Sequence, residues 1–578
     1  MSTKNKLMDF LNVDLSAPKM SNVDLTHSNR LTMSPGYIYP TMVLECLPSD
    51  RIRLNLKTIL KSDPTVSSLY GSFRQSHQAY FVPARLYVKG LDQNSTFGNE
   101  SFGMIPDEYP KFPSVTWTTR LSDGLMNGPQ SGVVDPGSLL ETLGMFPTDF
   151  SIRDHAWYYD DSDPQVLHGT IGSINAVPLI GYYDILRNYY FNAQEPAMPI
   201  VEYETREVPG ARPVRLVNVT KSQLDQFISE VYEDEVSDIF AVMDSNNLPS
   251  LFYGYNDYDA NELFSDRIGS DDDSLPLKVH AGYGVRTFDD DYFTTFLSNE
   301  FVDEIDNNAR VLVNQQTNSF TVNQLRRAYR LDKHNNRNLL GAGNSYDDYI
   351  YVHFNTSLGR ELNKPYFLGS YTSDFYFNDI YAQSQNSDPN TNNGSLGDRA
   401  GVLNASADAR DFVDFTCKEY GYLIVVSSII PRIDYHLGIP KLYLKTSMAD
   451  MYAPEFDAWG YQGIPNIEVD ATNRVDDQFD VTQKQPAWME HMTMFNRVHG
   501  LFTTNLEHSF QVLTKSKSDY FYPLDRDQIA PLRSSYVRPW DFNYIFEFQQ
   551  SWYDHFTMQI LFDCNAYRPI SKQILPTL

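Results

Sequence analysis

Segments with the pattern of β-strands occur at both ends of the chain and in its middle. The clearest is residues 51–56, RIRLNL, in which three aliphatic side chains alternate with Arg and Asn. Alternation with a period of two places the apolar side chains on one face of a strand and the polar ones on the other. Further segments rich in β-branched and aromatic residues lie at 77–90, 114–121, 420–430 and 554–569. A sheet built from them must join segments very distant in sequence, so we expect a mainly β protein with long-range strand pairing.

Helical signals are few. Residues 173–194 predict a helix because four apolar side chains share one face at helical spacing, namely Leu179, Tyr183, Leu186 and Tyr190. A second helix is expected over residues 321–338, with Thr321 as its N-cap and a glycine-containing end at 341–343. Within segment 77–90, Pro83 fits a strand only at an edge or a bulge.

Two long stretches have the composition of loops. Residues 383–410 are dominated by Asn, Ser, Asp and Gly. Residues 200–285 form an acidic insertion, and between Lys221 and Leu275 fourteen acidic residues stand against two basic ones. We expect this part to be a solvated protrusion and not core. Because the sequence has neither an internal repeat nor a clear linker, we interpret residues 1–578 as one β-sandwich with long inter-strand loops.

The charge and the cysteines restrict the class of protein. A formal net charge of −28 repels phosphate, so a freestanding nucleic-acid binder is disfavoured. An acidic protein can still enclose nucleic acid when a basic partner neutralises the phosphates. The sparse cysteines, Cys46, Cys417 and Cys564, form no CxxC pair and fit a reducing cytoplasm. With no signal peptide and no apolar run long enough to span a bilayer, we expect a soluble protein without a membrane partner.

A search for catalytic chemistry finds no HExxH, GxSxG, P-loop or GxGxxG motif in the sequence. His491 and His499 do not have a zinc-site spacing, and an ordinary packed or surface role is favoured for both. We therefore expect a protein that is not an enzyme, with no catalytic residue, no metal site and no cofactor.

Clusters of carboxylates leave two alternatives open. Acidic side chains gather at 160–163, 257–262, 271–273 and 289–291, and such oxygen ligands could bind calcium, although none matches an EF-hand loop. Solvated acidic loops are the commoner explanation. A pair of carboxylates could also serve a glycosidase, but sequence cannot show two of them facing one substrate.

Blocks along the whole chain resemble one protein family. Near the N-terminus the matching positions are His27, Gly36, Pro40, Glu45, Leu47, Pro48 and Asp50, with Ser49 where the family usually has Gly. The next strand matches at Tyr80, Phe81, Val82, Pro83, Arg85 and Leu86, and the helical segment matches at Ala176, Pro178, Tyr182, Asn188 and Gln194.

The strongest block spans residues 321–368, and a later one is QPAWMEHMTMFNRVHG at 485–500. In the first, the matching residues are Leu325, Arg326, Ala328, Gly343, Tyr346, Tyr349, His353, Phe354, Pro365 and Leu368. The blocks occur in the family's order, and the final segment, FTMQILFDCNAYRPISK, is similar to its last strand. The chain thus resembles the major capsid proteins of microviruses, especially the gokushovirus-like group.

The resemblance implies a fold and an assembly. The fold would be an eight-stranded antiparallel jelly roll, a viral β-sandwich with long inter-strand insertions and a few helices. Sixty copies would form a T=1 icosahedral shell, starting from pentamers, around a circular single-stranded DNA genome. Implied partners are a small basic DNA-associated viral protein, an assembly or scaffolding protein and a host surface receptor. The protein would be located in the virion after assembly in the cytoplasm of a bacterial host.

The acidic insertion at 200–285 lies where this family has the protrusion at the threefold axes. We hypothesise that it recognises the host, because exposed Tyr side chains supply contact area at low entropic cost. The candidate surface consists of Tyr253, Tyr255, Asp257, Tyr258, Asp271 and Asp272. Packing of those tyrosines in a small core of the insertion itself is an equal alternative. For the whole chain, the alternative is a carbohydrate-binding or carbohydrate-hydrolysing β-sandwich protein. The residues that contact DNA are not identified by the sequence.

Overall fold

Strands dominate the computed structural model, and helices are few and short. The structure describes residues 20–66, 69–88, 91, 111–118, 137–145, 170–191, 197–205, 214–233, 239–249, 276–277, 280–287, 350–351, 354–356, 363–381, 399–432, 434–435, 438–446, 450–454, 461–469, 471, 481–500, 545–546 and 554–570. None of the helices within these ranges is both long and apolar enough to cross a membrane.

The first sheet joins the two ends of the chain. Its order is β2 (His27–Met33), β18 (Phe556–Arg568), β4 (Arg51–Ser62) and β14 (Asn404–Thr416). The short strand β1 (Ser21–Asp24), which precedes β2 in the chain, pairs with the other end of the same edge of β18. Every pairing is antiparallel. On β4, buried and exposed residues alternate along most of the strand, so this sheet has one inner and one solvent-facing surface.

The second sheet is made of four strands, which come from four separate regions of the chain. Its order is β11 (Tyr366–Tyr376), β5 (Ser72–Pro83), β15 (Gly421–Pro431) and β3 (Tyr39–Cys46), again antiparallel throughout. Nearly every residue of β5 and β15 is buried. The apolar run of β15, and the burial of the polar residues Gln75, Ser76 and His77 in β5, therefore reflect a sheet that is covered on both faces.

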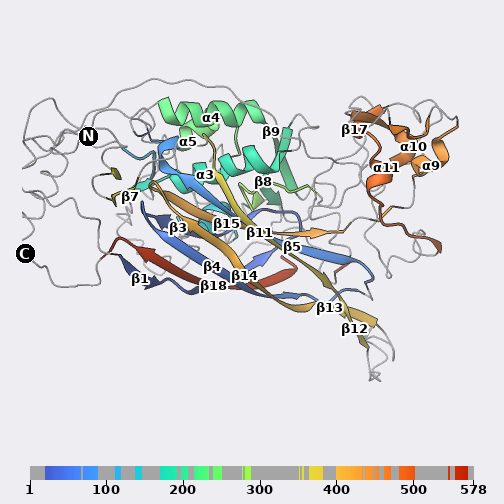
Figure 1. Ribbon diagram of the computed structural model, residues 1–578, viewed down its shortest axis with the longest axis horizontal. Coiled ribbons are helices and arrows are strands. Elements are labelled where there is room, and N and C mark those ends of the chain that lie inside the picture. Colours follow the sequence, from blue (N-terminus) through green and yellow to red (C-terminus); the bar gives the residue numbers. More distant parts are fainter. Residues whose placement is uncertain are drawn as a thin grey trace, which may run out of the picture.

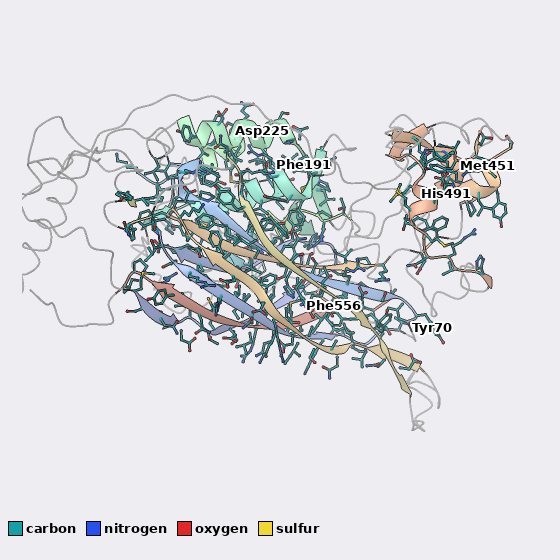
Figure 2. The ribbon with its side chains drawn as sticks, in the orientation of Figure 1. Tyr70, Phe191, Asp225, Met451, His491 and Phe556 are labelled. Atoms are coloured by element: carbon teal, nitrogen blue, oxygen red, sulfur yellow. The ribbon has the colours of Figure 1, made fainter. Side chains whose placement is uncertain are left out.

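The two sheets pack face to face and enclose the main core. The ring of Phe73 on β5 lies 5.2 Å from that of Phe556 on β18, and Phe81 lies 5.0 Å from Phe415 on β14, measured between centroids. Figure 2 shows Phe556 within this interior. Burial of such aromatic side chains stabilises a fold by about 1.5–3 kcal/mol each, so these contacts account for the choice of inner faces.

A third layer of helices and short strands covers the other face of the second sheet (Figure 1). It contains α3 (Val177–Ile185), the π-helical η3 (Leu186–Tyr190), α4 (Lys221–Glu233), α5 (Ile239–Ser245) and a small sheet in the order β10 (Pro276–Leu277), β8 (Ala197–Thr205) and β9 (Val214–Thr220). Gly181 of α3 approaches so closely that a Cβ there would lie 2.7 Å from Val82 of β5. Close contact of α3 with the sheet therefore requires glycine.

The remaining elements lie in the connections between the main strands. They are η1 (Ala84–Leu86), β6 (Ser114–Thr118), α2 (Leu139–Thr142), β7 (Thr170–Asn175), β12 (Asn378–Tyr381), β13 (Arg399–Val402), α9 (Lys441–Leu444), β16 (Tyr461–Pro465), α10 (Asn466–Val469), β17 (Val481–Pro486) and α11 (Met489–Met492). The long connections are 84–365, between β5 and β11, and 432–555, between β15 and β18. From the second of these, α9, α10, α11 and β17 gather in a cluster beside the sandwich (Figure 1).

Most expected strands and the first helix are confirmed. Segment 51–56 begins β4 with its aliphatic side chains buried, and β15 and β18 fill the segments expected near 420–430 and 554–569. Pro83 ends β5, so the strand expected at 77–90 begins earlier and stops at Pro83. The helix at 177–185 is buried on all sides rather than on one face, because the third layer encloses it. The helix expected at 321–338 lies outside the described residues.

Two expectations about loops are wrong in part. Residues 399–410, expected to be loop, form β13 and most of β14. The polar residues of β14 belong to the solvent-facing surface of the first sheet, whereas β13 pairs with β12 in a separate two-stranded sheet. The expectation that the stretch from Lys221 is solvated and not core fails for α4, whose Leu224 and Phe227 are fully buried. An amphipathic helix can carry acidic residues outside while it packs an apolar face inside, and Figure 2 shows Asp225 on the outer side of α4.

Candidate functional site

A buried ion pair joins two connections between main strands at one end of the sandwich. Arg85, which follows β5, places its Nε 2.9 Å from the Oε2 atom of Glu419, and both side chains are almost inaccessible to solvent. Glu419 lies in the short turn between β14 and β15, residues 417–420. The Nη2 group of Arg85 donates to the Tyr366 hydroxyl at 3.2 Å, at the start of β11. One guanidinium thus ties together the ends of four strands.

A second buried pair lies at the opposite end of the first sheet. The Nε2 atom of His280 lies 2.8 Å from Oδ1 of Asp554, and the hydroxyls of Thr32 and Ser34 donate to the same carboxylate. Burial alone would raise the pKa of Asp554, but the charge of His280 and these hydrogen bonds lower it below its usual value. The pair connects the end of the acidic insertion, at His280, with the end of β2 and with the segment just before β18.

Aromatic rings surround His280. Those of Tyr37, Tyr39 and Tyr283 have centroids between 4.9 and 6.2 Å from the imidazole. The tyrosine hydroxyls have structural partners, and that of Tyr39 accepts the backbone N–H of Ser34 at 2.9 Å. Burial raises the pKa of Tyr39 and of Tyr283 well above the ordinary value, so both remain neutral hydrogen-bonding groups.

A third polar group anchors α3 to the segment after β5. The Tyr87 hydroxyl donates to Asp184 Oδ2 at 2.5 Å, while Arg187 and Asn188 contact Oδ1 at 3.0 and 2.8 Å. Burial raises the pKa of Asp184, although Arg187 and the hydrogen bonds oppose that change. Full burial of a carboxylate requires this degree of pairing, and Asn188, one of the family-matching residues, supplies part of it.

The turn between β3 and β4 explains a departure from the family pattern. Ser49 has a φ of 72°, in the left-handed region where glycine has no steric penalty. Its hydroxyl donates to the carbonyl oxygen of Phe354 at 3.0 Å and also contacts Thr356. Ser49 therefore retains the glycine-type conformation of this turn and adds contacts to another segment.

The three cysteines, remote in sequence, are all buried and free, in or next to the main strands. Cys46 ends β3, Cys417 follows β14, and Cys564 lies within β18. Burial and the adjacent Cys46 thiol raise the pKa of Cys417 well above the ordinary value, and burial raises that of Cys564 to about 11. Thiols of this kind are packing groups in the core and not nucleophiles.

The solvent-facing surface of the first sheet has charges of both signs. Arg51 and Arg53 of β4 pair with Asp414 of β14 at 2.9 and 3.2 Å. Arg410 lies 3.6 Å from Asp408 on the same strand. Such exposed pairs are screened by salt and contribute little to stability. The surface is therefore a mixed polar one and not a continuous basic track for phosphates.

The cluster beside the sandwich is organised around Glu490. Lys445 and Lys441 lie 2.9 and 3.6 Å from its carboxylate, and Gln462 donates to it at 3.1 Å. Burial would raise the pKa of Glu490, but the hydrogen bond from Lys445 and the charge of Lys441 lower it overall. Trp488 immediately before α11 has a φ of 67°, a conformation that costs about 1–3 kcal/mol for such a residue.

Only some of the residues singled out in the sequence lie within the described part of the chain. Tyr253, Tyr255, Asp257, Tyr258, Asp271 and Asp272 lie outside the described residues, as do the four carboxylate clusters. His491 is exposed within 6.0 Å of the Tyr452 ring, and His499 is also exposed. Among the residues that the structure describes, no group of three or more His, Cys, Asp or Glu side chains is arranged to hold a metal ion.

Sequence reasoning found one member of the main ion pair and missed the other. Arg85 was already a family-matching residue, whereas Glu419 is a single acid in a short turn with no signal of its burial. The described polar groups all join strands and insertions to one another, and this arrangement stabilises a large scaffold. It provides no paired acid and base open to a substrate.

Comparisons with known proteins agree with this scaffold role. A family model described as capsid protein (F protein) matches residues 273–578, more than half of the chain. The chain is also 21% identical to the capsid protein VP1 of Chlamydia phage 1, over 93% of this chain and 95% of that protein. The capsid protein VP1 of Bdellovibrio phage phiMH2K is 26% identical over 33% of this chain and 35% of its own length.

These matches confirm the resemblance to microvirus capsid proteins, gokushovirus type included, and with it a structural rather than an enzymatic role in the virion. The carbohydrate-active alternative has no support from them. The chain belongs to the phage capsid protein (F protein) family.

Proposed function

We propose that the chain folds as an eight-stranded jelly roll in a single domain. The eight long strands alternate between the sheets along the chain, except that β5 and β11 are neighbours in the second sheet. The sheet orders β2-β18-β4-β14 and β11-β5-β15-β3 give two four-stranded antiparallel layers, the arrangement of a double-sheet jelly roll. This strand order is the observation that carries the proposal.

The protein then forms the shell of a virion from copies of itself. Sixty copies, assembled through pentamers, enclose a circular single-stranded DNA genome in a T=1 icosahedron. Closed point-group symmetry fixes the number of copies because each interface is repeated identically. Two buried ion pairs, Arg85–Glu419 and His280–Asp554, support the role of a shell subunit. A shell subunit must hold its long connections in fixed positions, and these pairs join such connections to the main strands.

The acidity of the chain indicates which partners it needs. At a net charge of −28, the shell cannot neutralise phosphate by itself, so a small basic viral protein accompanies the DNA. An assembly or scaffolding protein brings the acidic subunits together in the host cytoplasm, where repulsion between them would otherwise oppose association.

Negative-stain electron microscopy and light scattering of particles purified from host cells test the shell. Uniform closed particles whose mass corresponds to about sixty subunits are expected under T=1 symmetry. Particles of another size would refute T=1, and a chain that stays monomeric with all other phage proteins supplied would refute the shell itself.

We further infer that the insertion at 200–285 carries the host-recognition surface at the threefold axes. Its candidate tyrosines and carboxylates lie in the sequence between α5 and β10, and both of these elements belong to the third layer. Such an anchored insertion can vary at its tip without disturbing the core. The receptor would be a molecule on the host surface that contacts Tyr side chains.

A substitution series separates recognition from folding. Replacing the six candidate residues, Tyr with Ser and Asp with Asn, should leave particles intact and abolish adsorption to host cells. The matched control replaces only the tyrosines with Phe and should adsorb better than the Ser series. Unchanged adsorption of the Ser and Asn series would show that the surface lies elsewhere.

A further inference from the structure

The cluster formed from the connection between β15 and β18 exposes apolar side chains. These form the apolar patch, which consists of Leu442, Tyr443, Met451, Tyr452, Met492 and Met494. Met494 is 94% exposed and Tyr443 is 66% exposed, so these side chains are presented to solvent rather than packed into the sandwich. In Figure 2, Met451 and His491 lie in this cluster, well apart from Phe556 in the core.

Contacts inside the cluster hold the parts of the patch together. The Tyr452 ring packs edge-on against Trp488, with 5.3 Å between centroids, and so places Tyr452 next to α11. Lys445 of α9 contacts both Glu490 of α11 and the Trp488 ring. The two short helices and the 450–454 segment therefore form one unit. Contacts between these elements hold its exposed apolar side chains in place.

The size of the patch is that of a protein interface. Weighted by their exposed fractions, the six side chains present on the order of 700 Å² to solvent, which is close to the roughly 800 Å² that one partner contributes to a standard interface. The largest exposed apolar patch on a typical monomer covers roughly 300–600 Å², so an exposed area of this size within one cluster indicates an interaction surface. Three of the six are Met, whose flexible side chain adapts to an opposing surface.

The charges around the patch do not oppose the approach of a second copy of the chain. Two chains with a net charge of −28 repel each other over most of their surface. The patch side chains are uncharged, and the neighbouring Glu490 is neutralised by Lys441 and Lys445. This is therefore a surface at which two copies can approach closely, and membership of a capsid family makes contact between copies a requirement.

We propose that the apolar patch is a contact between neighbouring copies of this chain. The inference rests on the proposed shell and specifies one of its interfaces. Burial of the patch against the next copy removes apolar surface from water and drives association without a new charge pair. The contact belongs to the 432–555 connection, distinct from the acidic insertion proposed for the host.

Charged substitutions with matched apolar controls test the contact. Leu442→Asp and Met494→Asp are compared with Leu442→Met and Met494→Leu, in the full chain expressed with the remaining phage genes. We expect the Asp variants to lower the yield of closed particles at least about tenfold, because the contact would bury an unpaired carboxylate. The apolar variants should assemble within about twofold of the unaltered chain.

The outcomes are distinguishable. If the unaltered chain forms no particles, the shell fails and this inference fails with it. If the unaltered chain assembles and the Asp variants do so equally well, only the patch inference is overturned. Particles that form normally but lack another virion protein would show that a different protein covers the patch. A lower unfolding temperature of the soluble Asp variants would show that these side chains serve the fold instead.

Discussion

Replacing Arg85 with methionine should leave Glu419 as an uncompensated charge in the interior. Methionine keeps much of the volume of arginine but removes the ion pair at 2.9 Å and the hydrogen bond to Tyr366. Both partners are almost fully buried, so the remaining carboxylate cannot be hydrated without opening the turn at 417–420. Breaking a buried pair on one side typically costs about 3–5 kcal/mol, and we expect Arg85→Met to lose that much free energy of unfolding.

The double variant Arg85→Met with Glu419→Gln separates the charge from the packing. It removes the unpaired carboxylate, so at least about 2 kcal/mol of the loss should return, since isosteric neutral replacement of a buried pair is often nearly neutral. The single Glu419→Gln variant completes the double-mutant cycle. Urea unfolding of the purified chain, followed by tryptophan fluorescence and extrapolated to water, measures all four free energies.

The pH dependence provides an independent check. Protonation of the unpaired Glu419 removes its charge, so the deficit of Arg85→Met should be smaller at pH 5 than at pH 8. The double variant should show no such difference. A loss below about 1 kcal/mol for Arg85→Met, or a double variant as unstable as the sum of the single ones, would refute the reasoning.

Three other features of the structure give testable expectations. Burial raises the pKa of Glu468 from 4.5 to about 7. The contribution of Glu468 to the free energy of unfolding is therefore most favourable below pH 4.5 and is lost as the pH rises to about 7. Glu468→Gln should raise the free energy of unfolding at pH 8 by up to about 3 kcal/mol, and equal urea curves for both chains at pH 8 would contradict this. Gly421→Ala places a methyl group within 2.6 Å of the Phe81 ring, and a thermal melt should show a loss of about 1–3 kcal/mol. The three buried cysteines should react with a thiol reagent only after denaturation, and fast labelling of the native chain would show that the interior opens.

Strands with a strong periodic pattern were predictable, and those with a weak one were not. The alternation at 51–56 predicts β4 because one face of the first sheet is open to water. β14 has the same period, with Ala405, Ala407 and Ala409 facing inward, yet its small side chains and polar partners resemble a loop in composition. Pairing with β4 along almost its whole length, rather than intrinsic propensity, makes this segment a strand.

The pairing of distant groups could not be predicted from one sequence. Nothing near Glu419 indicates that Arg85 will meet it, because a chain folded through long-range pairing brings together residues that share no local pattern. The same limit applies to His280 and Asp554. The exposed apolar patch was missed for a different reason, since its Leu, Met and Tyr residues have the composition of an ordinary core.

The position of β18 inside the first sheet affects how the protein is made. This strand, Phe556–Arg568, lies between β2 and β4, so neither of these two earlier strands can pair with it until residues 63–555 have been synthesised. At about 5–20 residues per second, synthesis leaves the apolar edge of β4 without its neighbour for roughly a minute. Such a late, long-range closure is slow and exposes the intermediate to aggregation. We therefore expect a chain that stops before β18 to lack the strand between β2 and β4 and to be unable to take part in the proposed shell.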